Sequence, residues 1–112
     1  MSQPVRTVLL VISEGAETAE VVITHDNLKY AGIELTLAGL DDNGTVSCSC
    51  QLKIIPNCSL ESVKDNIYDA IVLPGGRHGP ENLQKSDLLG KMVENHFRQN
   101  KLIATICGGE CF

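Results

Sequence analysis

The stretch Ala70-Ile71-Val72-Leu73-Pro74-Gly75-Gly76 begins with four apolar residues and ends with a proline and two glycines. Apolar residues without polar alternation are typical of a strand that is buried on both faces, as strands of a parallel sheet are. Proline and glycine then end the strand in a turn. We therefore predict a parallel sheet with a ligand-binding edge, because open α/β sheets bind ligands beyond the carboxyl ends of their strands.

Three further segments have the composition of strands in the same sheet. Thr7–Ile12 is packed with Val, Leu and Ile, whereas apolar and polar residues alternate in Glu34–Gly39. Leu102–Ile106 is the last predicted strand, and it runs directly into Cys107-Gly108-Gly109. We expect this second glycine-rich turn to lie beside the first one, at the carboxyl ends of the strands.

Helices are predicted from periodicity and from their end signals. Glu17–Ala31 is followed by Gly32, which suits a left-handed C-terminal cap. Gly79-Pro80 places proline at a first helical position, and Ser86 is a suitable N-cap for a helix through Arg98. The apolar side of that helix is expected to contain Leu88, Leu89, Met92, Val93 and Phe97.

The middle of the chain is less regular. Asp41-Asp42-Asn43-Gly44 is a strong turn signal between segments that are able to form strands. Val46–Ile55 is predicted to form short strands that end at Pro56. Ser59–Asp65 is predicted to be a short helix with Ser59 as its cap.

These elements follow the order β-α-β, then a β-rich section, then β-α-β again. The order predicts an α/β fold with a parallel sheet and helices on both faces. We treat residues 1–112 as a single partial domain, because the chain stops at Phe112, where a helix should follow the last strand. The carboxyl-terminal part of the fold is therefore expected to be missing, either in a fragment of a longer protein or in a shortened product.

Composition narrows the classes of function. Of the 112 residues, 43% are hydrophobic and 21% are charged, which favours a folded domain over a disordered one. The net charge of −5 and the absence of a Lys/Arg cluster argue against direct binding of nucleic acid. No apolar stretch is long enough to span a membrane, and the first residues lack the features of a signal peptide. Five cysteines without an export signal suggest free thiols, so we expect a cytoplasmic protein.

Cys107 is the first candidate for chemistry. It follows a buried strand and precedes two glycines, as in a nucleophile elbow. A thiol at a helix N-terminus has a lowered pKa, because the helix dipole favours the thiolate. Gly75, Gly76 and Gly108 could present N–H groups that stabilise an oxyanion beside it. The alternative is a small core cysteine buried at the end of a strand.

Glu20 is the second candidate. It lies at the head of a stripe with Thr24, Leu28 and Ala31 on the first helix. A carboxylate on such a stripe is costly unless it is protonated or finds a partner. A protonated Glu20 could donate a hydrogen bond to the Cys107 thiolate. The alternative is a glutamate that only favours the N-terminal end of the helix dipole.

The combination of motifs resembles the ThiJ/PfpI superfamily, within it the branch of the Parkinson-disease protein deglycase. The matching stretches extend over nearly the whole chain in a consistent order. They are Gly15-Ala16-Glu17 with Glu20, Ala31-Gly32-Ile33, Ala38-Gly39-Leu40, Tyr68-Asp69, Val72-Leu73-Pro74-Gly75-Gly76, and Leu102-Ile103-Ala104 leading to Ile106-Cys107.

The resemblance implies a flavodoxin-like fold and a cysteine-dependent activity without a cofactor or metal. Cys107 would be the oxidation-sensitive nucleophile, Glu20 its protonated partner, and Gly76 and Gly108 the oxyanion donors. The implied activities are glutathione-independent glyoxalase chemistry on methylglyoxal and removal of early glycation adducts from proteins, with a role in the oxidative-stress response. Members are usually homodimers with the first helix at the interface. The alternative is a redox sensor or chaperone whose cysteine is oxidised without turnover.

The chain departs from the family's pattern in several places. Glu110 stands where close relatives carry proline, and the family's downstream histidine lies beyond the end of the chain. Tyr30 and Cys50 occupy positions where relatives place basic residues near the pocket. These departures make an inactive, truncated homologue a further alternative.

Rival interpretations have weaker support. The first loop, Ser13-Glu14-Gly15-Ala16, lacks the glycine pattern of a dinucleotide-binding site. Thr105 replaces the glycine that class I glutamine amidotransferases carry two positions before their cysteine. Cys48 and Cys50 are expected on one face of a strand, but two ligands do not make a zinc site. His25 is interpreted as helix surface, and His78 as a loop residue. His96 is interpreted as a helix-end residue favoured by the dipole.

Overall fold

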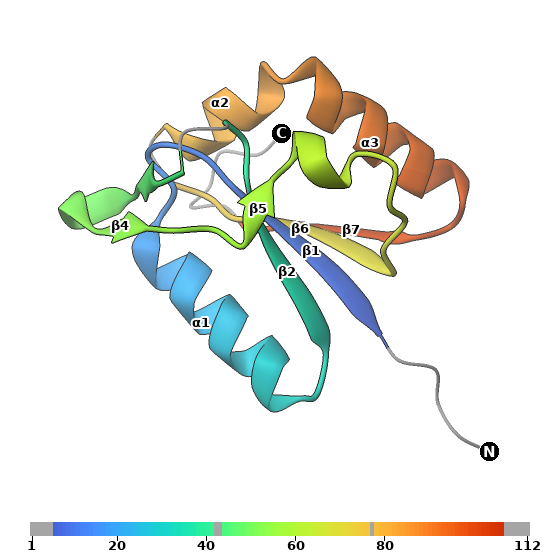
Figure 1. Cartoon of the computed structure of the whole chain (residues 1–112), viewed down its shortest axis with the longest axis horizontal. Coiled ribbons are helices and arrows are strands. Elements are labelled where there is room, and N and C mark those ends of the chain that lie inside the picture. Colours follow the sequence, from blue (N-terminus) through green and yellow to red (C-terminus); the bar gives the residue numbers. More distant parts are fainter. Residues whose placement is uncertain (1–5, 42–43, 77, 107–112) are drawn as a thin grey trace.

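The computed structural model of the chain describes residues 6–41, 44–76 and 78–106. A five-stranded parallel sheet with the order β5-β2-β1-β6-β7 forms its centre (Figure 1). This is the flavodoxin-like α/β architecture that the sequence predicts. The sheet strands are β1 (Thr7–Ile12), β2 (Glu34–Gly39), β5 (Cys58–Ser59), β6 (Ala70–Leu73) and β7 (Leu102–Thr105). The helices are α1 (Thr18–Tyr30), α2 (Gly79–Gln84) and α3 (Asp87–Arg98).

Helices cover both faces of the sheet, as predicted. Figure 1 shows α1 on one face and α2 with α3 on the other. Alternate side chains of β1 divide between two apolar cores, since Leu10 packs in the cluster that contains Val21 of α1, and Leu9 in the cluster that contains Leu89 of α3. Every residue of Val8–Ile12 is buried for this reason. None of the helices in the described part of the chain is long and apolar enough to cross a membrane.

The predicted helix ends are confirmed. Gly32 follows α1 with a φ of +81°, the left-handed conformation expected after a helix C-terminus. Pro80 lies in the first turn of α2. Ser86 is the N-cap of α3, and its hydroxyl accepts a hydrogen bond from the Leu89 N–H at 3.1 Å.

The segment after Gly44 forms a small antiparallel hairpin, and the prediction that Cys48 and Cys50 share one face of a strand is wrong. Strands β3 (Val46–Ser47) and β4 (Lys53–Ile54) pair with each other, and a 3₁₀ turn over Ser49–Gln51 separates them. Cys48 is 6% exposed, whereas Cys50 is exposed and has a φ of +58°. The two cysteines therefore do not share the face of a strand, because the chain turns between them.

The segment after Pro56 also differs from its prediction. Cys58–Ser59 forms β5, which pairs with the end of β2 at the edge of the sheet. The helical part is only a 3₁₀ turn over Glu61–Val63. Its N-cap is Leu60 and not the predicted Ser59, although the Ser59 hydroxyl accepts a hydrogen bond from the Ser62 N–H at 3.3 Å.

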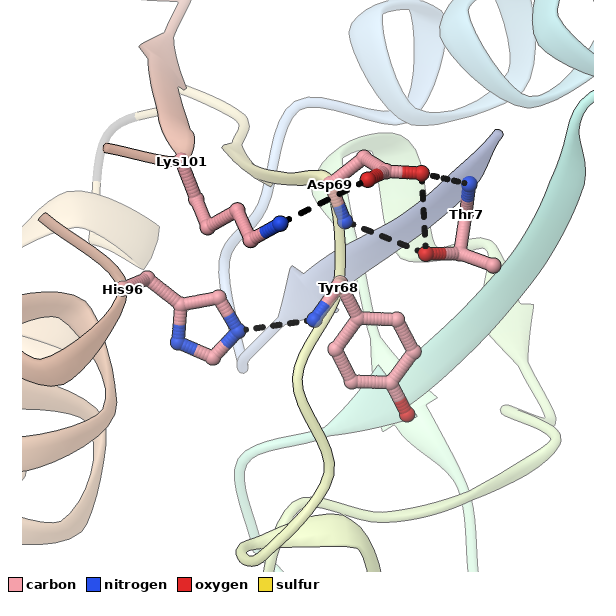
Figure 2. Close-up of polar contacts among 5 residues, drawn as sticks. All are labelled: Thr7, Tyr68, Asp69, His96 and Lys101. Carbon is pink, nitrogen blue, oxygen red and sulfur yellow. Dashed lines mark hydrogen bonds and ion pairs between the residues drawn. The ribbon is translucent and has the colours of Figure 1, made fainter. Parts of the chain in front are cut away.

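Helix α3 packs with most of the predicted apolar side, because Leu89 and Met92 are buried and Leu88 and Val93 pack against the same core cluster, but Phe97 is an exception. Phe97 is 72% exposed, although the sequence predicts it on the apolar side. His96 lies in the last turn of the helix, as predicted, and is only 1% exposed. His96 Nε2 accepts from the Tyr68 N–H at 3.0 Å (Figure 2). Its Nδ1 atom lies 2.7 Å from the Met92 carbonyl oxygen. A backbone N–H only donates, so Nε2 is the acceptor and Nδ1 is the nitrogen that can donate to the Met92 carbonyl.

A second polar contact joins three elements at the amino-terminal edge of the sheet (Figure 2). The Asp69 carboxylate accepts from the Thr7 N–H at 2.8 Å and lies 3.8 Å from the Lys101 ammonium. The hydrogen bond from the Thr7 backbone, with smaller contributions from Lys101 and Arg6, lowers the pKa of Asp69. Asp69 thus links the starts of β1, β6 and β7.

Candidate functional site

The glycine turn after β6 lies at the carboxyl edge of the sheet, beside the end of β7. The Ile106 N–H donates to the Leu73 carbonyl at 2.9 Å, which aligns the end of β7 with the residue before Pro74. Cys107 is the next residue in the sequence. Cys107 and Gly108 lie outside the described residues, so their predicted roles as nucleophile and oxyanion donor stay predictions.

Glu20 faces this turn rather than open solvent. The Gly75 N–H donates to Glu20 Oε1 at 2.7 Å, although the two residues are 55 positions apart. Glu20 is half-buried and Gly75 is buried. A carboxylate in this place can accept from the turn and, through its other oxygen, exchange a proton with a neighbouring group. The predicted contact of Glu20 with Cys107 is not among the described ones.

Gly75 and Gly76 have different environments. The Gly75 N–H is already bonded to Glu20, so an oxyanion there would compete with the carboxylate. Gly76 has a φ of +128° and pairs with Ala16 across an isolated bridge. A Cβ atom at Gly76 would lie 2.5 Å from the Gly15 carbonyl oxygen. Only glycine allows this close approach of the two loops.

A pocket of about 410 Å³ opens next to the turn. It is lined by Gly15, Glu17, Cys48, Ser49 and His78. Burial, and to a smaller extent the negative charge of Glu14, raises the pKa of the Cys48 thiol. Cys48 is therefore held as a thiol and is a poor nucleophile at neutral pH.

Two contacts of Ser49 in this region are not predictable from the sequence. Ser49 comes from the hairpin and bonds to the start of α1, where its hydroxyl accepts from the Thr18 N–H at 2.9 Å. Glu17 accepts a hydrogen bond from the same hydroxyl at 3.0 Å. Nothing in the local sequence indicates these contacts, because 31 positions separate Ser49 from Thr18.

Known proteins share the sequence pattern of this chain. The sequence model of the DJ-1/PfpI family matches residues 6–112. The chain belongs to the DJ-1/PfpI family. This match confirms the resemblance to the ThiJ/PfpI superfamily.

Relatives within the DJ-1/PfpI family support the assignment. The Parkinson disease protein 7 homolog of Danio rerio is 39% identical over 102 residues, which are 90% of this chain and 54% of that protein. The glutathione-independent glyoxalase DJR-1.2 of Caenorhabditis elegans is 32% identical over 101 residues, 90% of this chain and 53% of that protein. The chain thus spans about half the length of these relatives.

A solved structure agrees with the fold. Oxidized DJ-1 of Toxoplasma gondii superposes with a TM-score of 0.89 and is 33% identical. The match covers 91% of this chain and 55% of that one. The fold of this chain is therefore similar to that of a DJ-1 protein.

Proposed function

We propose that the whole protein is a cysteine-dependent, glutathione-independent glyoxalase with Cys107 as its nucleophile. The observation that carries this proposal is the Glu20 carboxylate on the Gly75 N–H, at the edge where β7 leads into Cys107. The nematode relative's name, a glutathione-independent glyoxalase, supports it. Because the relatives are about twice as long, the activity is proposed for a protein of their length.

In this proposal the Cys107 thiolate adds to the aldehyde carbon of methylglyoxal and forms a hemithioacetal. The N–H groups of Gly76 and Gly108 hold the oxyanion. The hydrogen on the former aldehyde carbon moves as a proton to the neighbouring carbon, with Glu20 or a residue beyond Phe112 as the carrier, which leaves a thioester. Water then releases lactate and restores the thiol. No cofactor or metal takes part.

Finer aspects of the function are also proposals. Glycated amines and thiols carry a carbonyl-derived carbon that the same nucleophile can attack, so early adducts on proteins are a second substrate class. A homodimer through α1 is consistent with its outer side, where Val22, Ile23 and Tyr30 are exposed, the last at 95%. A cytoplasmic location fits the free cysteines among the described residues.

Two substitutions in the full-length protein test the enzyme. Cys107→Ser should abolish the loss of methylglyoxal, because a hydroxyl is a far weaker nucleophile than a thiolate. Glu20→Gln should lower kcat about 10² to 10⁴-fold, the range for a lost general acid or base, and leave the fold intact. Cys50→Ser is the matched control, since Cys50 is an exposed thiol and should be dispensable. Wild-type protein that leaves methylglyoxal unchanged would refute the proposal.

The redox-sensor alternative is favoured by one observation, the oxidized state of the Toxoplasma gondii structure. On that hypothesis Cys107 is oxidised to a sulfenate and then a sulfinate before any other cysteine. Mild peroxide followed by peptide mass spectrometry measures this order. Clean oxidation of Cys107 in a protein without turnover would establish the sensor, whereas earlier oxidation of Cys50 would contradict both functions of Cys107.

A further inference from the structure

The first turn of helix α1 is capped by a residue from a distant segment. Glu17 is the N-cap residue, and its side chain makes no capping hydrogen bond. Instead, the Thr18 N–H donates to the Ser49 hydroxyl at 2.9 Å. The first N–H groups of a helix have no partner within the helix, so an oxygen supplied from outside stabilises the first turn.

Ser49 is joined to the start of α1 by more than this cap. Its N–H donates to the Ala16 carbonyl at 2.8 Å, and its carbonyl accepts from the Thr18 hydroxyl at 2.7 Å. Its hydroxyl also donates to Glu17 Oε1 at 3.0 Å. One residue of the hairpin thus bonds to three consecutive residues that lead into the helix.

The turn that carries Ser49 is itself held in place. Cys50 and Gln51 have φ values of 58° and 62°, which residues other than glycine adopt at a cost in free energy. At the other side of Cys48, the Gly15 N–H donates to the Ser47 carbonyl at 2.8 Å. Such a conformation persists only where surrounding contacts enforce it, so Ser49 is presented to α1 in one position.

The turn of α1 that Ser49 caps holds the Gly75 peptide from both sides. The Glu17 N–H donates to the Gly75 carbonyl at 2.9 Å, and the Gly75 N–H donates to Glu20 at 2.7 Å. Glu17 and Glu20 lie three positions apart, on the same side of the helix. Fraying of this first turn would therefore loosen both contacts of Gly75 together.

We propose that Ser49 is a positioning residue, which caps α1 from the hairpin and so keeps the Glu20 carboxylate on the Gly75 N–H. Its relevance to catalysis rests on the proposed function, in which Glu20 serves the Cys107 thiolate. The contact between Glu20 and Gly75 exists apart from that function. It can therefore be tested without measuring turnover.

Hydrogen exchange of the Gly75 amide, followed by NMR in the full-length protein, tests the proposal. Ser49→Ala should accelerate it about fivefold to tenfold, the effect of one lost cap on local opening. Ser49→Thr keeps the hydroxyl and should keep the slow rate. Ser86→Ala is the matched control, because it removes the cap of α3: it should accelerate exchange at Leu10 in the sheet but not at Gly75.

Two outcomes would overturn the proposal. The first is an unchanged exchange rate of the Gly75 amide in Ser49→Ala. The second is an equal rise of that rate in Ser49→Ala and Ser86→Ala, which would show a general loss of stability. If Ser49→Ala does not fold, Thr18→Val replaces it. That variant removes the two hydrogen bonds of the Thr18 hydroxyl, to the Ser49 carbonyl and from the Ser49 hydroxyl, but keeps the cap on the Thr18 N–H. It should accelerate Gly75 exchange to a smaller extent, and an unchanged exchange rate would again contradict the proposal.

Measurements of methylglyoxal turnover distinguish a failure of this inference from a failure of the proposed function. In an active wild type, Ser49→Ala should lower kcat more than it raises KM, and it should shift the pH profile in the same direction as Glu20→Gln. Ser49→Thr should restore both. A wild type without turnover would refute the glyoxalase, and the exchange data would still decide the role of Ser49. An active wild type with unchanged kcat in Ser49→Ala would overturn its role in the reaction.

Discussion

Gly76 illustrates how much one residue decides at the carboxyl edge. Its backbone has a φ of +128°, and the position of a Cβ atom there would lie 2.5 Å from the Gly15 carbonyl oxygen and 2.7 Å from the Glu17 nitrogen. Both of these are backbone atoms, which cannot rotate away as the end of a side chain can. The turn after β6 and the loop after β1 can therefore approach each other this closely only because residue 76 is a glycine.

Gly76→Ala should destabilise the protein by more than about 1–3 kcal/mol, the cost of a strained backbone conformation, because the clash adds to it. Urea unfolding measures the change. Gly90→Ala is the matched control, since a Cβ at Gly90 in α3 meets nothing within 4 Å. It should stabilise the protein by about 0.5–1 kcal/mol, because alanine favours the helix interior. Equal effects of the two substitutions would show that the close approach at Gly76 does not require glycine.

Single residues divide into those that the sequence can indicate and those that it cannot. Gly75 and Gly76 are predictable as a turn because glycine has a local conformational reason to stand after a strand. The place of Glu20 is predictable in part, since a carboxylate on an apolar stripe needs a partner. The sequence does not show that this partner is the Gly75 N–H, because Gly75 lies 55 positions away and reaches Glu20 only in the folded chain. Ser49 gives no local signal for the same reason.

At the scale of elements, His96 connects helix α3 to the segment that leads into β6, through its hydrogen bond with the Tyr68 N–H. His96→Leu should cost about 1–3 kcal/mol, because it leaves the buried Tyr68 N–H without its acceptor. His96→Gln should cost clearly less, since an amide can accept from Tyr68 and donate to the Met92 carbonyl. Urea unfolding at neutral pH compares the two. If leucine is tolerated as well as glutamine, the hydrogen bonds of His96 do not hold the helix.

Elements with a clear period and end signals are predictable from the sequence, and short ones are not. Helices α1 and α3 carry Gly32 and Ser86 at their ends, and the structure confirms both signals. Strand β5 has two residues, too few to show a period of two, so the sequence pattern assigns its second residue to a helix. In α3 the residue type misleads, because Phe97 is more apolar than His96 and yet lies one position outside the buried face.

For the whole molecule, Asp69 predicts a dependence of stability on pH. Its pKa is lowered in the folded chain, chiefly by the Thr7 N–H. A carboxyl with a lowered folded pKa stabilises the fold above the ordinary pKa of aspartate, and this contribution is lost as pH falls through the folded value. Asp69→Asn should therefore weaken the fold at pH 5 to 7 and flatten the loss of stability below about pH 4.

Urea unfolding at a series of pH values tests this prediction. Asp65→Asn is the matched control, because Asp65 is exposed in the loop before β6, and it should keep the wild-type pH dependence. The same acid slope in wild type and Asp69→Asn would show that Asp69 does not couple protonation to the stability of the sheet.

The architecture as a whole follows from the sequence more reliably than the site does. Buried apolar runs such as Val8–Ile12 require cover on both faces, and the structure provides it with α1 on one side and α2 and α3 on the other. The resemblance to the family rests on motifs spread over the chain and is confirmed over residues 6–112. The site is formed by contacts between loops, and such contacts produce no periodic pattern in the sequence from which they could be predicted.

The position of β1 inside the sheet has a consequence for folding while the protein is being synthesised. Val8 pairs with Leu35 on one side and with Ala70 on the other, so β1, which is synthesised before both of these neighbours, is enclosed only after residues beyond 70 exist. Thr7 and its partner Asp69 are 62 positions apart, an interval that a ribosome translating about 5–20 residues per second covers in about 3–12 s. During those seconds the nascent chain exposes an apolar, β-prone segment, which is where a chaperone would protect it from aggregation.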